Sequence, residues 1–243
     1  MDMKAKMGFG RKMPRKITRR DFMAAAGGTI VFIGLPGVFC KLTDSDNQAM
    51  AAELRSDGQL RIPPGQHAVK ALPDMGGLQS DGDVSEWSLK IDGEVENPLI
   101  LKIADLMRLE QIAQTCDVHC VTGWTLLDSR WRGIPMKTIM ELVKVKNTAG
   151  FVIFEAPGKY SSNISIREAG KNNVLLAHSL FDKKLPEANG APLRVLVPDR
   201  YFYKSVKWVR RIKFTVTDEP GYYESNGYSN TADPWKEERF EDN

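Results

Sequence analysis

The amino-acid sequence predicts an α+β fold, and three observations support this prediction. The chain has 243 residues, enough for one domain with a small appendage. Hydrophobic residues make up 42% and charged residues 27% of the chain, close to the average of soluble globular proteins. Short segments with strand periodicity mix with short helical patterns, without the regular strand–helix alternation of a doubly wound sheet. We therefore expect mixed sheets with short helices around a sizeable core.

The expected elements begin near residue 87. Trp87, Leu89 and Ile91 alternate with polar residues, which predicts a half-buried strand that turns at Asp92-Gly93. Pro135 can open a helix, and apolar side chains at helical spacing follow it. In chain order, the other expected elements are a short helix over 102–110, a strand over 115–121, a buried strand over 151–154, an apolar segment over 174–177, a strand over 193–197 and an alternating stretch over 208–216.

The N-terminal stretch is strongly basic. Residues 1–21 contain eight Lys or Arg and two acidic residues, so they contribute +6 to a net charge of +3, and the remaining residues sum to −3. An uncharged apolar stretch, 22–39, follows. This order is typical of an export signal. The junction Arg19-Arg20-Asp21-Phe22 resembles the twin-arginine consensus. We therefore expect residues 1–51 to be a twin-arginine signal peptide with its cleavage region, which directs the protein to the periplasm.

A retained membrane anchor is the alternative for residues 22–39, since about 18 apolar residues is the lower limit for spanning a bilayer. The glycines and Pro36 within the stretch weaken a continuous helix. Because the net positive charge belongs to the leader and the rest of the chain sums to −3, nucleic-acid binding is not expected. The twin-arginine machinery carries folded proteins and serves mainly those whose cofactor is inserted before export. We therefore expect a bound cofactor.

The body divides into an arm and a domain. Residues 52–86 are polar and rich in Asp, Gly and Pro, as in an extended N-terminal arm. Residues 87–243 contain the strand and helix patterns and are expected to form the catalytic domain. Within it, the stretch 218–243 is polar and aromatic and is expected to wrap the surface of the core.

Two of the three cysteines, Cys116 and Cys120, lie in the body, and Cys40 ends the apolar leader. This is no disulfide framework. On a strand, Cys116 and Cys120 would lie about 13 Å apart at roughly 3.3 Å per residue, beyond disulfide reach.

Cys120 follows His119 directly, and the residues alone leave three interpretations open. Zinc uses Cys and His ligands, but neighbouring residues on a strand point to opposite faces, and His67 and His178 are distant in sequence. A nucleophilic thiol with a remote base is the second interpretation. A buried structural cysteine is the third and the commonest fate of a free cysteine.

The surrounding motif adds a resemblance. The segment 118–124, Val-His-Cys-Val-Thr-Gly-Trp, is followed at 131–136 by Trp-Arg-Gly-Ile-Pro-Met. Together they resemble the sulfite-oxidase superfamily of molybdopterin enzymes, in particular its compact bacterial members without a haem domain. There, the Cys of a Cys-Val-x-x-Trp segment shortly before Trp-x-Gly-x-Pro ligates molybdenum. The resemblance implies that Cys120 is the metal ligand, a role that suits a thiolate.

A second segment, from Asn189 to Trp208, resembles the pterin-anchoring segment of the same family. Arginine, lysine and backbone N–H groups can hold the terminal phosphate of a pyranopterin, and an amide can bind a ring edge. A solvated basic strand is the simpler interpretation of the lysines alone. The residues that the resemblance assigns to cofactor binding are Asn189, Arg194, Lys204, Ser205, Val206 and Lys207.

The resemblance implies a periplasmic oxidoreductase that transfers an oxygen atom at a molybdenum–molybdopterin centre, cycling between Mo(VI) and Mo(IV). Because the chain carries no haem-attachment motif, electrons would come from a separate redox partner, a cytochrome or a membrane haem subunit. His119 is a candidate polar or proton-carrying catalytic residue, and Tyr160 and Arg130 are weaker candidates. His119 and Thr122 replace the Arg and Glu of the related bacterial sulfoxide reductase, so sulfite and S- or N-oxides all stay open as substrates.

Two other functions remain open at this point. One is a cofactor-binding or electron-transfer module of the same fold without turnover of its own. The other is an exported binding protein without molybdenum, in which Cys120 is structural. Metal analysis distinguishes the binding protein without molybdenum from the other two functions. Turnover with sulfite and with sulfoxides distinguishes the enzyme from the module without turnover.

Overall fold

A computed structural model describes residues 53–55, 58–75 and 87–241. The chain divides into a unit over 1–36 and a unit over 37–243, and the first lies wholly outside the described residues. The signal peptide expected at 1–51, with its cleavage region, therefore also lies outside them. In the described part, no helix is both long enough and apolar enough to cross a membrane.

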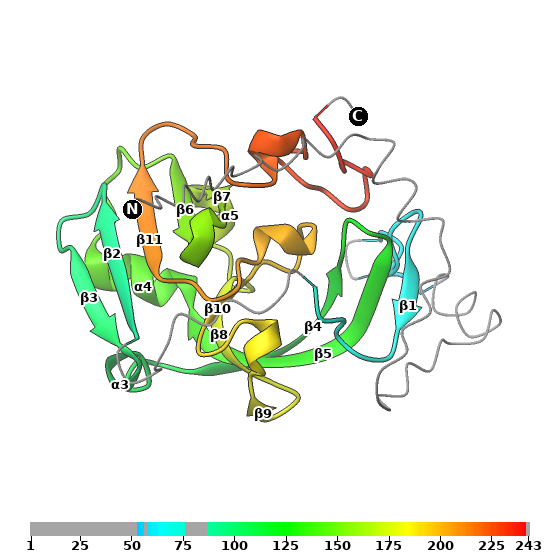
Figure 1. Cartoon of the computed structure of the whole chain (residues 1–243), viewed down its shortest axis with the longest axis horizontal. Coiled ribbons are helices and arrows are strands. Elements are labelled where there is room, and N and C mark those ends of the chain that lie inside the picture. Colours follow the sequence, from blue (N-terminus) through cyan, green and yellow to red (C-terminus); the bar gives the residue numbers. More distant parts are fainter. Residues whose placement is uncertain (1–52, 56–57, 76–86, 242–243) are drawn as a thin grey trace, which may run out of the picture. The chain divides into compact units, whose positions relative to one another are not determined.

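Two sheets form the described part of the larger unit (Figure 1). One has six strands and runs in the order β1-β5-β8-β10, with β4 paired to β5 and β9 to β8. Its strands are β1 (His67–Val69), β4 (Ile112–His119), β5 (Trp124–Pro135), β8 (Leu175–Leu180), β9 (Lys183–Lys184) and β10 (Arg194–Leu196).

The second sheet has five strands in the order β3-β2-β11-β6-β7. They are β2 (Ser88–Gly93), β3 (Leu99–Lys102), β6 (Phe151–Glu155), β7 (Ser161–Ser165) and β11 (Arg211–Thr215). The helices are short: α3 (Ile103–Leu106), α4 (Met136–Val143) and α5 (Ile166–Ala169), with 3₁₀ turns at Pro157–Lys159, Glu187–Asn189, Phe202–Lys204 and Glu224–Asn226.

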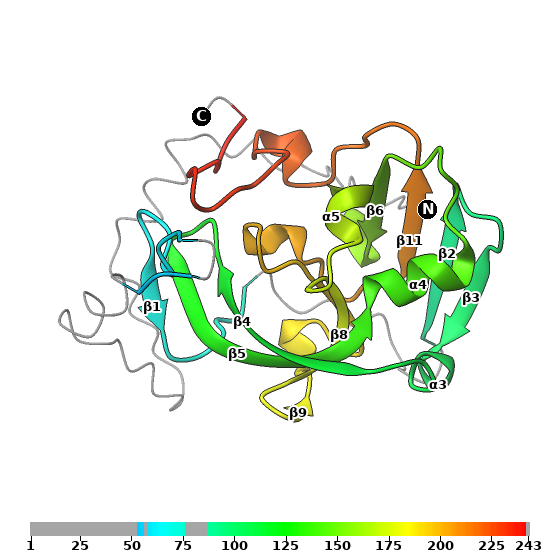
Figure 2. The same cartoon turned by 180° about the vertical axis from the view of Figure 1, so that it is seen from behind.

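The main apolar core lies between α4 and the five-stranded sheet, and Figure 2 shows the helix beside β11 and β2. Met136, Ile139 and Val143 are fully buried on α4 at the spacing of one helix face, and they pack in one cluster with side chains of β2, β6 and β11. The same cluster includes Ile134, Leu176 and Val195 of the six-stranded sheet, so the core is shared by both sheets. The sequence therefore predicted the helix after Pro135 and the face that it buries correctly.

The long strand β5 connects the regions that matter for function. β4 lies antiparallel along one edge of β5, while β1 and β8 share the opposite edge. β1 belongs to the arm and pairs parallel with the first residues of β5, with His67 opposite Trp124. The arm thus supplies a strand to the six-stranded sheet, which its polar composition did not predict.

Several expected elements differ in extent. The helix expected over 102–110 has only four residues, α3, and the strand expected over 115–121 begins earlier and ends at His119. The alternating stretch 208–216 forms β11 only from Arg211. The α+β class with mixed sheets and short helices is confirmed. The domain boundaries at 51/52 and 86/87 stay predictions.

Candidate active site

Cys120 lies in the tight connection between β4 and β5. The Cys120 N–H donates to the Trp124 carbonyl at 2.8 Å, and the Gly123 N–H donates back to the Cys120 carbonyl at 3.0 Å. Gly123 has a φ of +100°, a conformation that favours glycine. The Cys-x-x-Gly-Trp spacing therefore has a local cause, since the turn needs glycine at this position to bring the chain into β5.

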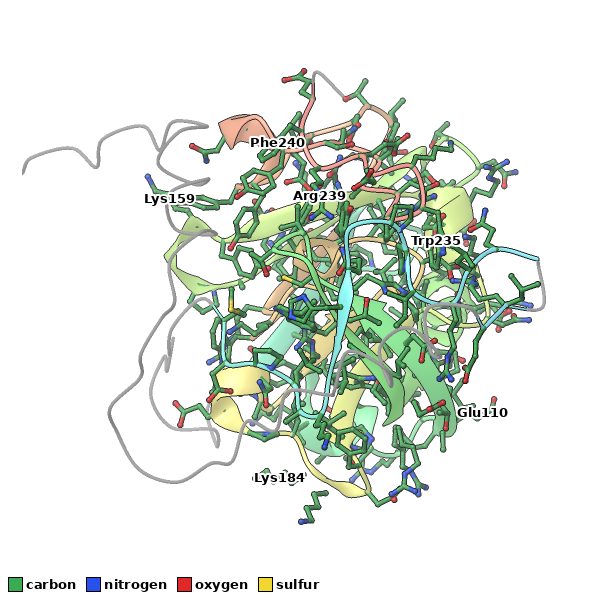
Figure 3. The ribbon with its side chains drawn as sticks, turned by 90° about the vertical axis from the view of Figure 1, so that its right-hand side faces the viewer. Glu110, Lys159, Lys184, Trp235, Arg239 and Phe240 are labelled. Carbon is green, nitrogen blue, oxygen red and sulfur yellow. The ribbon has the colours of Figure 1, made fainter. Side chains whose placement is uncertain are left out.

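The Cys120 side chain is buried, and its sulfur accepts a hydrogen bond from the Thr122 hydroxyl at 3.1 Å. Burial raises the pKa of the thiol, while the Thr122 hydrogen bond and the nearby Arg239 guanidinium oppose that shift. Arg239 also donates to the carbonyl oxygen of Val121. Figure 3 shows Arg239 on the C-terminal segment, close to β1. Thr122 itself is exposed.

His119 has different neighbours from Cys120, as strand alternation predicts. Its Nδ1 lies 2.9 Å from the Thr125 hydroxyl, and its ring packs edge-on against Trp235. Burial lowers the pKa of His119 to about 4, so the imidazole is neutral at neutral pH. Its Nε2 is buried and has no hydrogen-bond partner within the described residues. The catalytic role of His119 stays a prediction.

Residues of the arm also hydrogen-bond to the Cys120 turn. The Gln66 amide donates to the Cys120 carbonyl at 3.0 Å and accepts from the Thr125 hydroxyl at 3.4 Å. The His67 N–H donates to the Gly123 carbonyl at 2.9 Å. The arm therefore contacts the turn through both a backbone and a side-chain hydrogen bond. Sequence reasoning did not identify Gln66, whose only signal was its position after the rigid Pro63-Pro64-Gly65 segment.

Arg194 is a deeply buried cation of the predicted anchoring segment, with 2% of its surface exposed. Its guanidinium donates to the carbonyl oxygens of Asn189, at 3.0 Å, and Ser205, at 2.8 Å, and it lies 4.1 Å from the Phe202 ring centre. Among the described residues, no carboxylate pairs with it. Burial without a countercharge lowers its pKa to about 10.

Lys207 and Asn189 lie beside Arg194. The Lys207 ammonium donates to the carbonyl oxygens of Ala188 and Met75 and lies 4.0 Å from the Trp208 ring centre. Burial and the Arg194 charge lower its pKa to about 8, against the opposing effect of Asp74. The Asn189 amide donates to Asp74 at 3.1 Å. We call Asn189, Arg194 and Lys207 the anchor cluster.

Glycine at 190 allows the anchor cluster to form. Gly190 has a φ of +109°, and a Cβ there would lie 3.0 Å from the Lys207 Cβ and 3.1 Å from the Arg194 Cβ. The two cationic residues therefore approach each other across a backbone that has no side chain. This explains the glycine of the Asn-Gly-Ala-Pro sequence in physical terms.

Ser205 and Val206 support this segment through the backbone. The buried Ser205 hydroxyl accepts from the Val197 N–H at 2.9 Å, and the Val206 carbonyl accepts from the Val195 N–H at 2.8 Å. Val206 also belongs to the main core. Both residues fix the strand that presents Arg194, and their direct contact with a cofactor stays a prediction.

Lys204 is placed differently from the other predicted cofactor ligands. Its ammonium forms an ion pair with Glu224 at 2.5 Å and donates to the Asn163 side-chain oxygen at 2.8 Å. Both side chains of the pair are at most 2% exposed. Lys204 therefore joins the C-terminal segment to β7, and its charge is already neutralised by Glu224. We call this the Lys204–Glu224 pair.

Three tyrosines of the domain, Tyr160, Tyr223 and Tyr228, form an aromatic group. Burial raises the pKa of each, and the Cys120 thiol contributes to each shift. The Tyr223 ring packs against Tyr160 and Tyr228, with ring centres 5.8 and 5.2 Å apart. The stretch 218–243 thus packs its aromatic side chains against the core of the domain, as expected.

Arg130, the other weak candidate, lies elsewhere. It pairs at 2.8 Å with Asp182, and both side chains are more than half exposed. No contact within the described residues connects it to Cys120 or the anchor cluster.

Both described cysteines are free thiols, in agreement with the argument against a disulfide. Burial raises the pKa of Cys116 to about 12, which makes it a poor nucleophile at neutral pH. In the described part, no three His, Cys, Asp or Glu side chains come together as metal ligands. A metal at Cys120 would therefore need ligands that these residues do not supply.

The donor set of the anchor cluster fits molybdopterin. A buried guanidinium and ammonium that rest on neutral carbonyl oxygens can bind a phosphate, and the Asn189 amide can bind a pterin ring edge. Cys120 supplies a single thiolate, which complements a cofactor that carries its own sulfur ligands.

Comparison with known proteins agrees with this chemistry. The family described as "Oxidoreductase molybdopterin binding domain" matches residues 76–223, more than half of the chain. The protein named uncharacterized oxidoreductase YuiH, from Bacillus subtilis (strain 168), is 36% identical over 188 residues, which cover 76% of this chain and 95% of YuiH.

Two further matches are more partial. The protein-methionine-sulfoxide reductase catalytic subunit MsrP of Xanthomonas campestris pv. campestris is 32% identical over 147 residues, which cover 54% of this chain and 45% of MsrP. The crystal structure of the sulfane dehydrogenase SoxCD from Paracoccus pantotrophus matches with a TM-score of 0.52 and 21% identity, over 57% of this chain and 40% of that chain. The likeness to SoxCD shows the shared fold.

The family match covers the Cys120 turn and the anchor cluster together, and YuiH aligns over nearly its whole length. The protein is therefore an enzyme whose cofactor is molybdopterin with molybdenum. The chain belongs to the molybdopterin-binding oxidoreductases of the sulfite-oxidase superfamily.

Proposed function

We propose that the protein transfers an oxygen atom to or from a small molecule at a molybdenum centre ligated by Cys120. One observation carries this proposal above the others. Arg194 is buried with no carboxylate partner among the described residues, so the folded protein retains a buried cation whose charge an anionic ligand would compensate. The phosphate of molybdopterin is such a ligand.

The residues divide the work of holding the cofactor. Arg194 and Lys207 would bind the phosphate, and Asn189 would bind the pterin ring. Ser205 and Val206 would present these groups from a fixed strand. Lys204 would act indirectly, by fixing the C-terminal segment through Glu224.

The bound cofactor supplies the two-electron oxygen-atom transfer chemistry. Cys120 provides the thiolate from a rigid turn, because four of its backbone and side-chain neighbours, Gln66, Thr122, Gly123 and Trp124, hydrogen-bond to it. The packed rings of Tyr160, Tyr223 and Tyr228 would limit the access of water near the sulfur. His119 would contribute a neutral imidazole, whose Nδ1 lies 2.9 Å from the Thr125 hydroxyl.

The substrate class is sulfite or an S- or N-oxide. The name of MsrP, a methionine-sulfoxide reductase, supports an S-oxide, but the match spans less than half of that protein. His119 directly precedes the proposed metal ligand and Thr122 lies two residues after it, at the positions where we expect the related reductase to carry Arg and Glu. A separate redox partner would exchange the electrons, because no haem-attachment motif accompanies the domain.

The location that fits this function is the periplasm. The basic and apolar segments of residues 1–39 and the Arg19-Arg20 junction support export by the twin-arginine machinery after cofactor insertion. Protease added to intact spheroplasts tests this location. Cleavage of the mature chain by the added protease supports export, whereas protection would place the chain in the cytoplasm.

Metal content and turnover test the proposal together. We expect about one molybdenum per chain in protein from a molybdopterin-producing host, and reaction with sulfite or with a sulfoxide in the presence of an artificial electron carrier. Cys120→Ala should lose turnover, while Cys116→Ala, the matched control, should keep it. Molybdenum-loaded protein that turns over no substrate of either class would contradict the proposed reaction, and a wild type without molybdenum would contradict the cofactor site.

A further inference from the structure

The exposed Thr122 sits beside the buried Cys120 sulfur, and the turn fixes this arrangement. Thr122 lies between two buried residues, Val121 and Gly123. The reciprocal hydrogen bonds of Cys120 with Gly123 and Trp124 fold the turn back, so that the Thr122 hydroxyl approaches the sulfur to 3.1 Å. Among the described residues, it is the side-chain group that donates a hydrogen bond to this sulfur.

The backbone around Thr122 is held independently of its hydroxyl. Gln66 fixes the Cys120 carbonyl, Arg239 fixes the Val121 carbonyl, and the His67 N–H fixes the Gly123 carbonyl. The hydroxyl therefore contributes little to the shape of the turn. Its role follows from the atom that it contacts.

We propose that Thr122 is a positioning residue of the molybdenum centre, whose hydroxyl orients the Cys120 thiolate and weakens its electron donation to the metal. This inference rests on the proposed ligation by Cys120. A hydrogen bond to a metal-bound sulfur withdraws electron density from it, and such bonds are among the features that set the reduction potential of metal–thiolate sites. Less donation from sulfur favours the reduced metal, so the hydroxyl raises the reduction potential.

The consequence concerns the direction of the reaction. A higher potential favours acceptance of electrons from a substrate, and a lower one favours their return to an oxidised substrate. The residue at position 122 thus adjusts the balance between oxidation and reduction through the ligand, from a solvent-facing position that leaves the core unchanged.

A matched pair of variants separates the hydroxyl from the shape of the side chain. Thr122→Val keeps the branched shape and removes the donor, and Thr122→Ser keeps the donor. Both are prepared as holoenzyme, their molybdenum content is measured, and the midpoint potential is determined by redox titration of the Mo(V) electron paramagnetic resonance signal.

We expect equal molybdenum content in all three proteins and a lower midpoint potential in Thr122→Val. At the wild-type midpoint, the ratio of oxidised to reduced molybdenum should rise about tenfold, the effect of one hydrogen bond to a charged acceptor. Thr122→Ser should keep the wild-type potential. Equal potentials in all three loaded proteins would overturn the inference and leave the proposed function intact. A shift of the same size in Thr122→Ser would also overturn it, since the hydroxyl would not be its cause. A wild type without molybdenum would overturn both proposals.

Discussion

Two groups of buried cations lie a few residues apart in this protein and differ in their partners. In the Lys204–Glu224 pair, the ammonium contacts a carboxylate at 2.5 Å, and the Ser162 hydroxyl donates to the same oxygen. In the anchor cluster, Arg194 and Lys207 contact carbonyl oxygens, which carry no net charge. The first group is neutral as it stands, whereas the second retains positive charge that an anion can compensate. Burial alone therefore does not identify a ligand site, and the charge of the partner does.

The largest effect is expected from removing the partner in the neutral group. Glu224→Ala leaves the Lys204 ammonium buried without a countercharge, which costs about 3–5 kcal/mol of folding free energy. Urea unfolding measures this loss. The double variant Lys204→Met/Glu224→Leu removes both charges and should recover most of it while keeping the wild-type molybdenum content. A stable double variant without molybdenum would return Lys204 to the cofactor-binding residues.

Removing the cation in the anchor cluster should affect the cofactor first. Arg194→Met deletes the guanidinium that would bind the phosphate, so we expect molybdenum per chain to fall about tenfold or more, the effect of losing one charged hydrogen bond. Arg194→Lys keeps the charge but loses the forked geometry and should retain an intermediate amount. Full loading of Arg194→Met in elemental analysis would show that the cofactor is held elsewhere.

The pH dependence of stability offers a smaller test of the same contrast. Because the pKa of Lys207 is lowered to about 8, the unfolded chain binds more protons at this residue between pH 8 and about 10. The stability of the cofactor-free protein should therefore rise over this window relative to that of Lys207→Met. Chemical denaturation at a series of pH values measures the difference.

The exposed Lys183→Met variant serves as the control for this titration. Its stability difference from wild type should not change with pH in the same direction. If the difference in stability between wild type and Lys207→Met does not change from pH 8 to 10, burial does not lower the pKa of Lys207.

The smallest effect is expected at Arg130, whose ion pair with Asp182 is exposed. Such pairs contribute roughly 0–1 kcal/mol, so Arg130→Ala should keep its stability within that range and its molybdenum content at the wild-type level. Thermal unfolding and metal analysis check both. A loss of metal without a loss of stability would connect Arg130 to the site after all.

The sequence singled out the Cys120 turn and the anchor cluster through local motifs, because glycine positions and short spacings determine their shape, while their roles in cofactor binding stay predictions. Gly123 and Gly190 both adopt positive φ, and both belong to the segments that resemble the family. The helix after Pro135 followed from its periodic apolar face. In these places, neighbouring residues decide the structure.

Long-range partners could not be predicted. Lys204 and Lys207 lie in one short run, and only the folded chain shows that Glu224 compensates the first and not the second. The sequence also did not predict the register shift between Cys116 and Val118. Asp117, between them, accepts a hydrogen bond from Arg61 in the arm, a partner that is distant in sequence. Gln66 from the arm and Arg239 from the C-terminal stretch both bond to the Cys120 turn, and their distance in sequence hid this contact as well.

X-ray absorption at the molybdenum edge tests the central claim most directly, because it counts the sulfur atoms bound to the metal. The spectra of wild type, Cys116→Ser and Cys120→Ser are compared at equal molybdenum content. We predict that Cys116→Ser matches wild type and that Cys120→Ser has one sulfur fewer, replaced by a lighter ligand. An unchanged sulfur count in Cys120→Ser would contradict the assignment of Cys120 as the molybdenum ligand.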